Sequence, residues 1–455
     1  MYHESDRGSL FQAAPHSYLR TRLQLAVLFL ASAIAAASVW FYFDRILVAH
    51  QVNDATAHER PRGNLSDLYP RWLGARELLL HGRNPYSHEV TLEIQEGYYG
   101  RQLDASRPND PKDQQGFAYP VYVVFLLAPL VRLPFHQVQI FFHWLLIGLI
   151  AASVPLWLRA LHWRIGALAV AIAAVLAIGS VPAVQGIKLQ QLSLLVASLL
   201  AGSAACMASG FLFCGGVLLA LATIKPQLAF FVGAWAVLWA ASDWRRRRNF
   251  VFGFGLAMGL LLAGSESVLP GWMGMFVRAV QQYHRYTQNQ SVLDQLLPGT
   301  FAGKIAAMLA MALAAALLWR LRHAPADSPE FGSAIALLMA TTVLVVPMYA
   351  PYNQVLLLPA ILLLVRDRRR VALSGSRGLR FVYGAGALAV LWQWIASSAL
   401  CMTYLISPEQ AMNGWKSPFF ATFALPVLIF ALTVIDVQGD LRSFAGAQGD
   451  ADGGK

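Results

Sequence analysis

Charged residues are scarce in this chain. Asp, Glu, Lys and Arg make up 13% of its 455 residues, whereas soluble domains use roughly 25%. Hydrophobic residues make up 57%, and many of them form apolar runs of about 20 residues, the length at which a helix crosses a bilayer. The scarcity of charge therefore excludes a string of soluble domains and predicts an all-α, polytopic integral membrane protein.

Cysteine is scarce as well. The three cysteines, Cys206, Cys214 and Cys401, all lie in or beside apolar segments. Their positions match neither a disulfide framework nor the spacing of a metal site. We therefore expect no metal ion in this protein.

Acidic residues are outnumbered by basic ones, 24 against 35, which gives a formal net charge of +11. Such an excess can indicate nucleic-acid binding. Here, however, the basic residues lie in short loops between apolar runs, where they set the topology of a membrane protein. We therefore expect the lipid bilayer, and no nucleic acid, as a partner.

Twelve apolar segments are predicted to span the membrane. They alternate with the basic clusters so that the clusters at 245–248 and 366–370 both fall on the cytoplasmic side. The predicted spans are 23–43, 137–158, 165–182, 192–208, 211–224, 228–241, 250–269, 301–319, 331–346, 355–365, 381–400 and 419–437. Together they form one transmembrane domain over residues 23–437, in a multi-pass protein of the cell membrane.

Both termini are predicted to be cytoplasmic. The N-terminal segment 1–22 contains Arg7, Arg20 and Arg22 directly before the first span, which favours the cytoplasmic side. The tail 438–455 is rich in Gly, Asp and Ala, a composition typical of disorder.

The first outer loop, 44–116, contains a predicted interfacial helix over 67–81. Ser66 suits its N-cap, Asp67 follows in the first turn, and Gly82 suits its end. An apolar stripe recurs at helical spacing, formed by Leu68, Trp72, Ala75 and Leu79. Such a helix lies flat at a membrane surface. Residues 87–116 look irregular and mobile, and the proline-punctuated segment 117–134 reads as a half-embedded helix on the outer side.

This topology collects polar side chains at the outer face. They are Asp67, Lys188, Lys225, Arg285, Tyr349, Tyr352 and Asn353. Lys225 stands between two apolar runs, where an ammonium group is costly and therefore indicates function. Two plainer interpretations stay open: Lys225 can extend to lipid head groups, and Asp67 can simply stabilise the start of its helix.

Several of these residues fall in sequence motifs with a specific resemblance. The motifs are Asp67-Leu-Tyr, ARELLLHGRNPY at 75–86, FAYP at 117–120, LAPLVRLP at 127–134, QLSLL at 191–195, ATIKPQ at 222–227 and APYNQVLLLP at 350–359. In order and spacing they resemble glycosyltransferase family 87, once catalogued as domain of unknown function 2029, within the GT-C superfamily. The resemblance covers roughly residues 60–365. Pro70 departs from the plain helix former that the family usually has, but proline is tolerated in a first turn.

The resemblance implies a GT-C-like bundle of about 12 transmembrane helices. It also implies a metal-independent hexosyltransferase, often a mannosyltransferase, which uses a polyprenyl-phosphate sugar and needs no cofactor beyond that donor. The acceptor would be a lipid or glycan hydroxyl outside the membrane. Asp67 matches the family's catalytic acid, and the expected substrate-binding residues are Lys225, Lys188, Gln191, Arg285, Tyr349, Tyr352, Asn353 and Tyr119.

Elementary chemistry agrees with this reading. Sugar transfer to a hydroxyl needs a base for the acceptor proton and a cationic setting for the leaving phosphate, and Asp67 and Lys225 supply both types. The alternative is a secondary transporter of about 12 spans, which predicts two related halves and charged residues near the bilayer midplane. The sequence shows neither clearly. A structural membrane scaffold has no specific feature in its favour.

Overall fold

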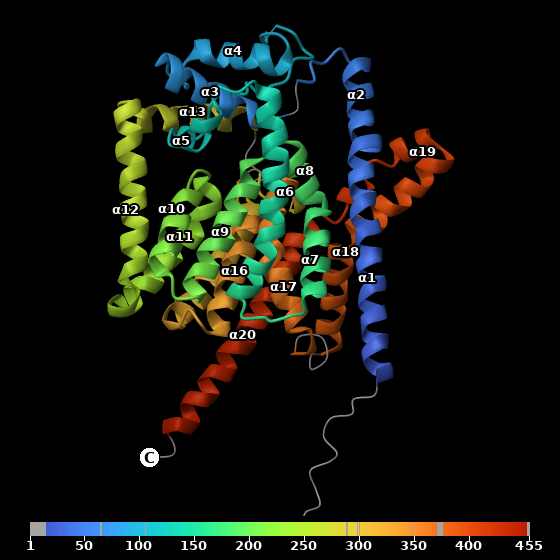
Figure 1. Ribbon diagram of the computed structural model, residues 1–455, viewed down its shortest axis with the longest axis vertical. Helices are drawn as coiled ribbons and strands as arrows, with labels where there is room; N and C mark the ends of the chain where they lie inside the picture. Colours follow the sequence, from blue (N-terminus) through green and yellow to red (C-terminus); the bar gives the residue numbers. More distant parts are fainter. Residues whose placement is uncertain are drawn as a thin grey trace, which may run out of the picture.

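The computed structural model describes residues 15–63, 66–104, 106–287, 290–297, 299, 301–347, 349–370 and 376–452. Throughout these residues the regular structure is helical and no strand occurs, which confirms the all-α class. The order of the elements can be followed in Figure 1.

The helices have the following bounds. The first half of the chain forms α1 (Pro15–Phe41), η1 (Tyr42–Leu47), α2 (Val48–Ala57), α3 (Tyr69–His81), α4 (His88–Tyr99), α5 (Val123–Leu127), η2 (Ala128–Leu130), α6 (Phe135–Ala160), α7 (Ala167–Ile178), α8 (Val181–Lys188), α9 (Leu192–Ala208) and α10 (Leu212–Ala222). The second half forms α11 (Pro226–Ser242), α12 (Trp244–Val268), α13 (Trp272–Thr287), α14 (Val292–Leu296), α15 (Ala302–Arg320), η3 (Leu321–His323), α16 (Pro329–Val345), η4 (Pro351–Leu357), α17 (Leu358–Arg366), α18 (Arg377–Ile406), α19 (Pro408–Asn413), η6 (Ser417–Phe419) and α20 (Ala424–Asp452).

The length and composition of these helices indicate a polytopic membrane protein. Within the described residues, six helices are long and apolar enough to cross a membrane, and the bent pair α7 and α8, with a 58° angle between them, makes up to seven. Five further apolar helices are shorter, at 10–17 residues. Every predicted span overlaps at least one helix. Crossing by all twelve stays a prediction, because the shorter helices fall below the roughly 20 residues of a typical span.

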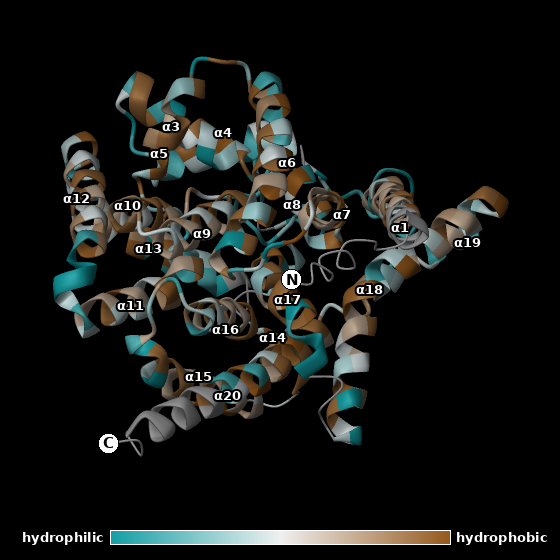
Figure 2. Cartoon of the chain, turned by 60° about the horizontal axis from the view of Figure 1, so that its bottom comes forward, coloured by the Kyte–Doolittle hydropathy of each residue, from teal (hydrophilic) through white to brown (hydrophobic). Residues whose placement is uncertain are grey.

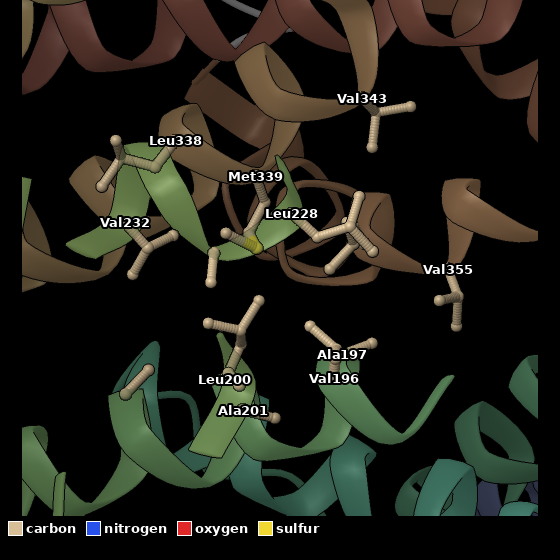
Figure 3. Close-up of a cluster of buried hydrophobic side chains, with 14 of the residues drawn as sticks. Val196, Ala197, Leu200, Ala201, Leu228, Val232, Leu338, Met339, Val343 and Val355 are labelled. Atoms are coloured by element: carbon tan, nitrogen blue, oxygen red, sulfur yellow. The ribbon is translucent and has the colours of Figure 1, made fainter. Parts of the chain in front are cut away.

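The core of the bundle is built from helices with small and branched apolar side chains. Figure 3 shows side chains of α9, α11 and α16 facing one another, among them Leu200, Val232 and Leu338. Small residues also permit close helix contacts. A Cβ atom at Gly216 of α10 would lie 2.2 Å from the carbonyl oxygen of Phe250 in α12, so these two helices pack backbone against backbone.

Two ends of the bundle differ in character. The helices α3, α4, α5 and α13 gather at one end, at the top of Figure 1, which is called the cap end below. The basic clusters 245–248 and 366–370 lie at the opposite end, where Figure 2 shows hydrophilic colour at the starts of α12 and α18. The predicted outer and inner groups are thus separated, and which side of a membrane each end faces stays a prediction.

The cap end is more helical than the sequence predicts. Residues 87–116 do not form one irregular loop, because α4 occupies His88–Tyr99. The hydroxyl of Ser87 accepts the backbone N–H of Val90, and Gly100 ends the helix with a left-handed φ of 77°. Both are ordinary helix-boundary signals. Segment 117–134 contains only the five-residue helix α5 and the short η2, too short to cross a bilayer.

Helix α3 begins two residues later than the predicted helix 67–81, so Asp67 precedes its first turn. The location of this helix at a membrane surface stays a prediction. The helix starts at Tyr69 with Leu68 as N-cap and has no side-chain cap, so Ser66 is not its cap. Pro70 lies in the first turn, where it is tolerated. Gly82 ends the helix in the left-handed conformation, at φ 65°.

The predicted boundary of the disordered tail is wrong. Helix α20 runs past residue 438 to Asp452, and Asp440 and Leu441 are buried. The reason is an ion-pair cluster: Asp436 and Asp440, one helical turn apart, both pair with Arg370, and Ser333 donates a hydrogen bond to Asp440 at 2.8 Å. At the other terminus, residues 1–14 of the predicted cytoplasmic segment lie outside the described residues.

Candidate active site

A cavity of about 400 Å³ opens at the cap end. Its walls come from the start of α3, the segment 113–120, the turns before α9 and α11, helix α13 and η4. Six of the predicted site residues line it: Asp67, Tyr119, Gln191, Lys225, Tyr352 and Asn353. Residues almost 290 positions apart in the chain therefore meet at one place.

Asp67 is held at both its backbone and its side chain. Its N–H donates to the carbonyl oxygen of Leu189 at 2.9 Å, in the turn between α8 and α9. Its carbonyl oxygen accepts from Arg71, one helical turn later, at 2.7 Å. Its carboxylate accepts a hydrogen bond from the side-chain amide of Gln191. The carboxylate is thus fixed to the bundle as well as to α3.

The electrostatic surroundings of Asp67 oppose one another. Burial raises the pKa of its carboxyl group, while the charges of Arg71 and Lys225 and the hydrogen bond from Gln191 lower it. The charge of Asp113 raises it further, and the net pKa lies above the ordinary value. A carboxylate in this setting is a stronger base than one in water.

Lys225 belongs to a buried polar network. It lies in the turn that joins α10 to α11, and Pro226 follows it at the first helical position. Its ammonium group donates to the side-chain oxygen of Gln191 at 2.8 Å and to the hydroxyl of Ser193 at 2.7 Å. The Ser193 hydroxyl in turn donates to the side-chain oxygen of Asn353 at 2.9 Å. The chain of contacts therefore runs from Asn353 through Lys225 and Gln191 to Asp67.

Aromatic rings flank the two cations of the cavity. The Lys225 ammonium lies 5.6 Å from the ring centre of Tyr119 and 5.5 Å from that of Tyr352. The guanidinium of Arg71 lies over the Tyr119 ring at 4.6 Å. Because ring faces attract cations, Tyr119 and Tyr352 hold the positively charged groups at the cavity wall without neutralising their charge.

Sequence reasoning missed several lining residues. Arg71 was not among the predicted site residues, although its position four residues after Asp67 puts both on one face. Asp113 was assigned to an irregular loop. It lines the cavity, and its carboxylate accepts from the backbone N–H and the side-chain amide of Gln115, at 2.9 and 3.0 Å. Tyr283 and His284 come from α13, which was expected to be part of a loop.

Three predicted site residues lie elsewhere. Lys188 forms an ion pair with Asp44 at 2.5 Å and does not line the cavity. The Tyr349 hydroxyl donates to the carbonyl oxygen of Thr422 at 3.0 Å, which ties it to the segment before α20. Arg285 lines a second cavity next to the first. Only part of the predicted set of site residues therefore lies at the first cavity.

The described residues contain no group of three or more His, Cys, Asp or Glu side chains that could hold a metal ion. A metal-independent reaction nevertheless stays a prediction. The polar groups that the cavity does present are two carboxylates, two cations and several hydroxyl and amide groups. That combination can bind an anion and accept a proton in adjacent positions.

Comparison with known proteins gives one match. The model of glycosyltransferase family 87 matches residues 117–347, slightly more than half of the 455-residue chain. The matched range includes Tyr119, Gln191 and Lys225, but it begins after Asp67 and ends before Tyr352. No curated protein and no solved structure matches the chain.

Proposed function

Because the chain belongs to glycosyltransferase family 87, we propose that it transfers a hexose, with mannose as the expected sugar, from a polyprenyl-phosphate donor. The acceptor is a hydroxyl group of a lipid or glycan, and the reaction takes place at the extracytoplasmic face of the membrane. Family membership supports a membrane glycosyltransferase and weighs against the secondary transporter. Family membership does not specify the sugar, the lipid donor or the acceptor, and these three assignments belong to the proposal.

One observation carries the proposal: a carboxylate and a buried ammonium group meet through a single amide at the wall of an open cavity. Asp67, Gln191 and Lys225 form this connection. In the proposed reaction the acceptor oxygen bonds to the sugar carbon that carries the phosphate. The bond from that carbon to the phosphate oxygen breaks, and its electron pair leaves with the phosphate. The acceptor proton passes to Asp67.

Asp67 is the proposed general base. Its carboxylate is positioned by Gln191 and lies in a setting that raises its pKa, both of which suit proton abstraction near neutral pH. Asp113 is the second carboxylate of the cavity and the alternative base. Two of its hydrogen-bond acceptor positions are taken by Gln115, so we assign it to the binding of sugar hydroxyl groups.

Lys225 is proposed to attract the donor phosphate. An ammonium group has three N–H donors, and Gln191 and Ser193 take two of them. The third is free to meet a phosphate oxygen at the cavity wall. Arg71 adds a second positive charge there, and both cations stabilise the negative charge that develops on the leaving phosphate.

The direct test is transfer by the purified protein. It is incubated with radiolabelled polyprenyl-phosphate mannose, the glucose analogue and a lipid extract from the native membrane. The expected result is a labelled product from the mannose donor. If neither lipid-linked donor is consumed while a nucleotide sugar is, the proposed donor class is wrong.

The proposed side of the reaction has its own test. The native cysteines are replaced, and single cysteines are placed at Lys112, beside the cavity, and at Arg246, in the basic cluster of the opposite end. A membrane-impermeant thiol reagent added to intact cells should label position 112 alone, with position 246 labelled only after permeabilisation. The reverse pattern would put the cavity in the cytoplasm and remove an extracytoplasmic reaction.

A further inference from the structure

A second cavity, of about 310 Å³, adjoins the first at the cap end. Its volume lies in the range of ligand pockets, roughly 300–1,000 Å³. It is bounded by the segment 114–118, by Tyr86 and Thr91 at the start of the α4 region, and by the last turns of α13. None of the functions assigned above uses it.

The two cavities share a wall. Gly116, Ala118 and Tyr283 line both of them. Gly116 leaves this wall thin, because a Cβ atom placed there would meet only the Thr91 hydroxyl, at 4.0 Å. Tyr86 of the second cavity also donates its hydroxyl to the carbonyl oxygen of Tyr119 in the first, at 2.6 Å. A molecule in the second cavity therefore lies directly beside the reacting groups.

The hydrogen-bonding groups of the second cavity are of two kinds. The hydroxyls of Tyr86 and Thr91 already donate to carbonyl oxygens, so they can only accept from a ligand. Such acceptors suit the O–H groups of a sugar or polyol. Gln282 and Arg285 of α13 supply N–H donors.

Arg285 gives the cavity its charge. Among its lining residues, all of which the structure describes, Arg285 is the one charged side chain, and it forms no salt bridge within the described residues. Its five N–H donors match the oxygens of a phosphate or carboxylate. The matching ligand therefore combines hydroxyl groups with one anionic group.

We infer that the second cavity is the acceptor subsite, and that it takes a hydroxyl-bearing head group with a phosphate, which Arg285 binds. This rests on the proposed function, because a transferase needs the acceptor next to the base and the donor. The head group places one hydroxyl across the thin wall at Gly116, within reach of Asp67. Tyr283, common to both cavities, lies between the two substrates.

The test separates the acceptor by charge. Native membrane lipids are divided by anion exchange into neutral and acidic fractions, and water-soluble glycan phosphates form a third fraction. Each is offered to the purified full chain with radiolabelled polyprenyl-phosphate mannose. Label should enter the acidic lipid fraction. Label in the soluble acidic fraction would support the same phosphate-binding site with a free head group as its source.

Matched variants assign the effect to Arg285. Arg285→Ala should raise the acceptor concentration for half-maximal rate about ten- to a hundredfold, the equivalent of one lost charged hydrogen bond, with the donor KM unchanged. Arg285→Lys should restore part of it. Arg278→Ala removes the same charge from the same helix, but Arg278 lines neither cavity, so its acceptor KM should stay at the wild-type value.

A second variant tests the shared wall. Gly116→Leu adds a side chain at the wall that the two cavities share, and it should slow transfer to the lipid acceptor more than hydrolysis of the donor by water. Label in the neutral fraction alone, or equal acceptor KM values in Arg285→Ala and Arg278→Ala, would overturn the inference and leave the glycosyltransferase intact. Donor that is neither transferred nor hydrolysed would overturn the proposed function itself.

Discussion

Two buried cations at opposite ends of the molecule have different surroundings. Arg247, at the start of α12, is 6% exposed, and Lys225, at the cap end, is 7% exposed. Arg247 donates to four main-chain carbonyl oxygens, those of Trp239, Arg322, His323 and Ala324, at 2.7–3.0 Å. It also stacks on the Trp239 ring at 4.2 Å. Lys225 instead meets two side chains and lines a cavity.

The difference shows that burial alone does not distinguish a structural cation from a functional one. Arg247 uses its donors to hold the ends of α11 and η3 together, and it lines neither of the two cavities at the cap end. Its burial has a structural purpose that the carbonyl contacts explain. The Lys225 ammonium has two hydrogen-bond acceptors for its three N–H donors, and one of them, Gln191, also contacts the Asp67 carboxylate. A buried cation indicates a functional site when its donors are incompletely used and a cavity reaches it.

The largest effect that this comparison predicts falls on the acid at the end of the Lys225 network. Asp67→Asn should lower the transfer rate by about 10²–10⁴-fold, the contribution of a positioned general base. The amide keeps the size of the carboxylate, so folding and donor KM should stay near normal. Initial rates with saturating donor measure the effect.

Asp113→Asn is the matched control for that experiment. It removes the other carboxylate of the same cavity and should cost much less in rate than Asp67→Asn. The reverse ranking of the two variants would make Asp113 the base. If Asp67→Asn keeps more than about a tenth of the normal transfer rate, the loss is smaller than the removal of a general base causes. Asp67 would then have a structural role.

Substitution of Lys225 and substitution of Arg247 should change different properties of the protein. Lys225→Ala should raise the donor KM about ten- to a hundredfold, from the loss of a charged hydrogen bond of about 1.5–3 kcal/mol, and Lys225→Arg should retain part of the binding. Arg247→Ala should leave the donor KM unchanged. The Arg247→Ala variant leaves buried carbonyl oxygens without a hydrogen-bond donor, and one such unsatisfied group costs about 1–3 kcal/mol. The melting temperature of this variant in detergent should therefore drop.

An equal loss of melting temperature in both variants, with an unchanged donor KM, would remove the distinction. Lys225 would then be a structural cation like Arg247. Thermal unfolding and donor titration on the same preparations measure both properties together.

A smaller effect is expected in the pH dependence of transfer. The folded protein raises the pKa of Asp67, so the base form, and with it the rate, is lost as the pH falls through that raised value. The charge of Lys225 lowers this pKa and that of Asp113 raises it. The acid limb of kcat should therefore move to higher pH in Lys225→Ala and to lower pH in Asp113→Asn.

The opposite signs of these shifts are the informative result. A general loss of structure would shift the acid limbs of the two variants in the same direction, or would shift neither. Identical acid limbs in the wild type, Lys225→Ala and Asp113→Asn would mean that Asp67 does not titrate in the rate-limiting step.

The smallest effect is predicted for Lys188. It pairs with the half-exposed Asp44 and lines neither cavity, and an exposed ion pair contributes about 0–1 kcal/mol. Lys188→Ala should therefore change the transfer rate by less than about fivefold. A loss as large as that of Lys225→Ala would show that substrate reaches Lys188 in a way that the cavity does not reveal.

The positions of most helices and part of the site follow from the sequence because they depend on local composition. Apolar runs predict helices wherever they occur, and the cost of an ammonium between two such runs pointed to Lys225. The order of motifs placed Tyr119, Gln191 and Asn353 beside it. Helix α13 was within reach too, since Trp272, Phe276 and Val280 recur every four residues.

The rest depends on partners distant in the chain. Arg71 looks like a surface residue until Tyr119 packs on it, and Asp113 gains its place only from the fold of the loop after α4. Lys188 and Asp44 are separated by 144 positions, so no local pattern predicts their pairing. The tail was assigned to disorder by composition, which gives no sign that Asp436 and Asp440 meet Arg370.

The shortness of α10 has a consequence for the membrane itself. With 11 residues it rises about 16 Å, roughly half of the 30 Å thickness of a hydrocarbon layer. Lys225 is the third residue after its end. Where α10 faces lipid, the leaflet must thin or water must fill the gap. In the proposed reaction, such a thinned leaflet would bring the phosphate of a lipid-linked donor to the depth of Lys225 while it stays in the head-group layer.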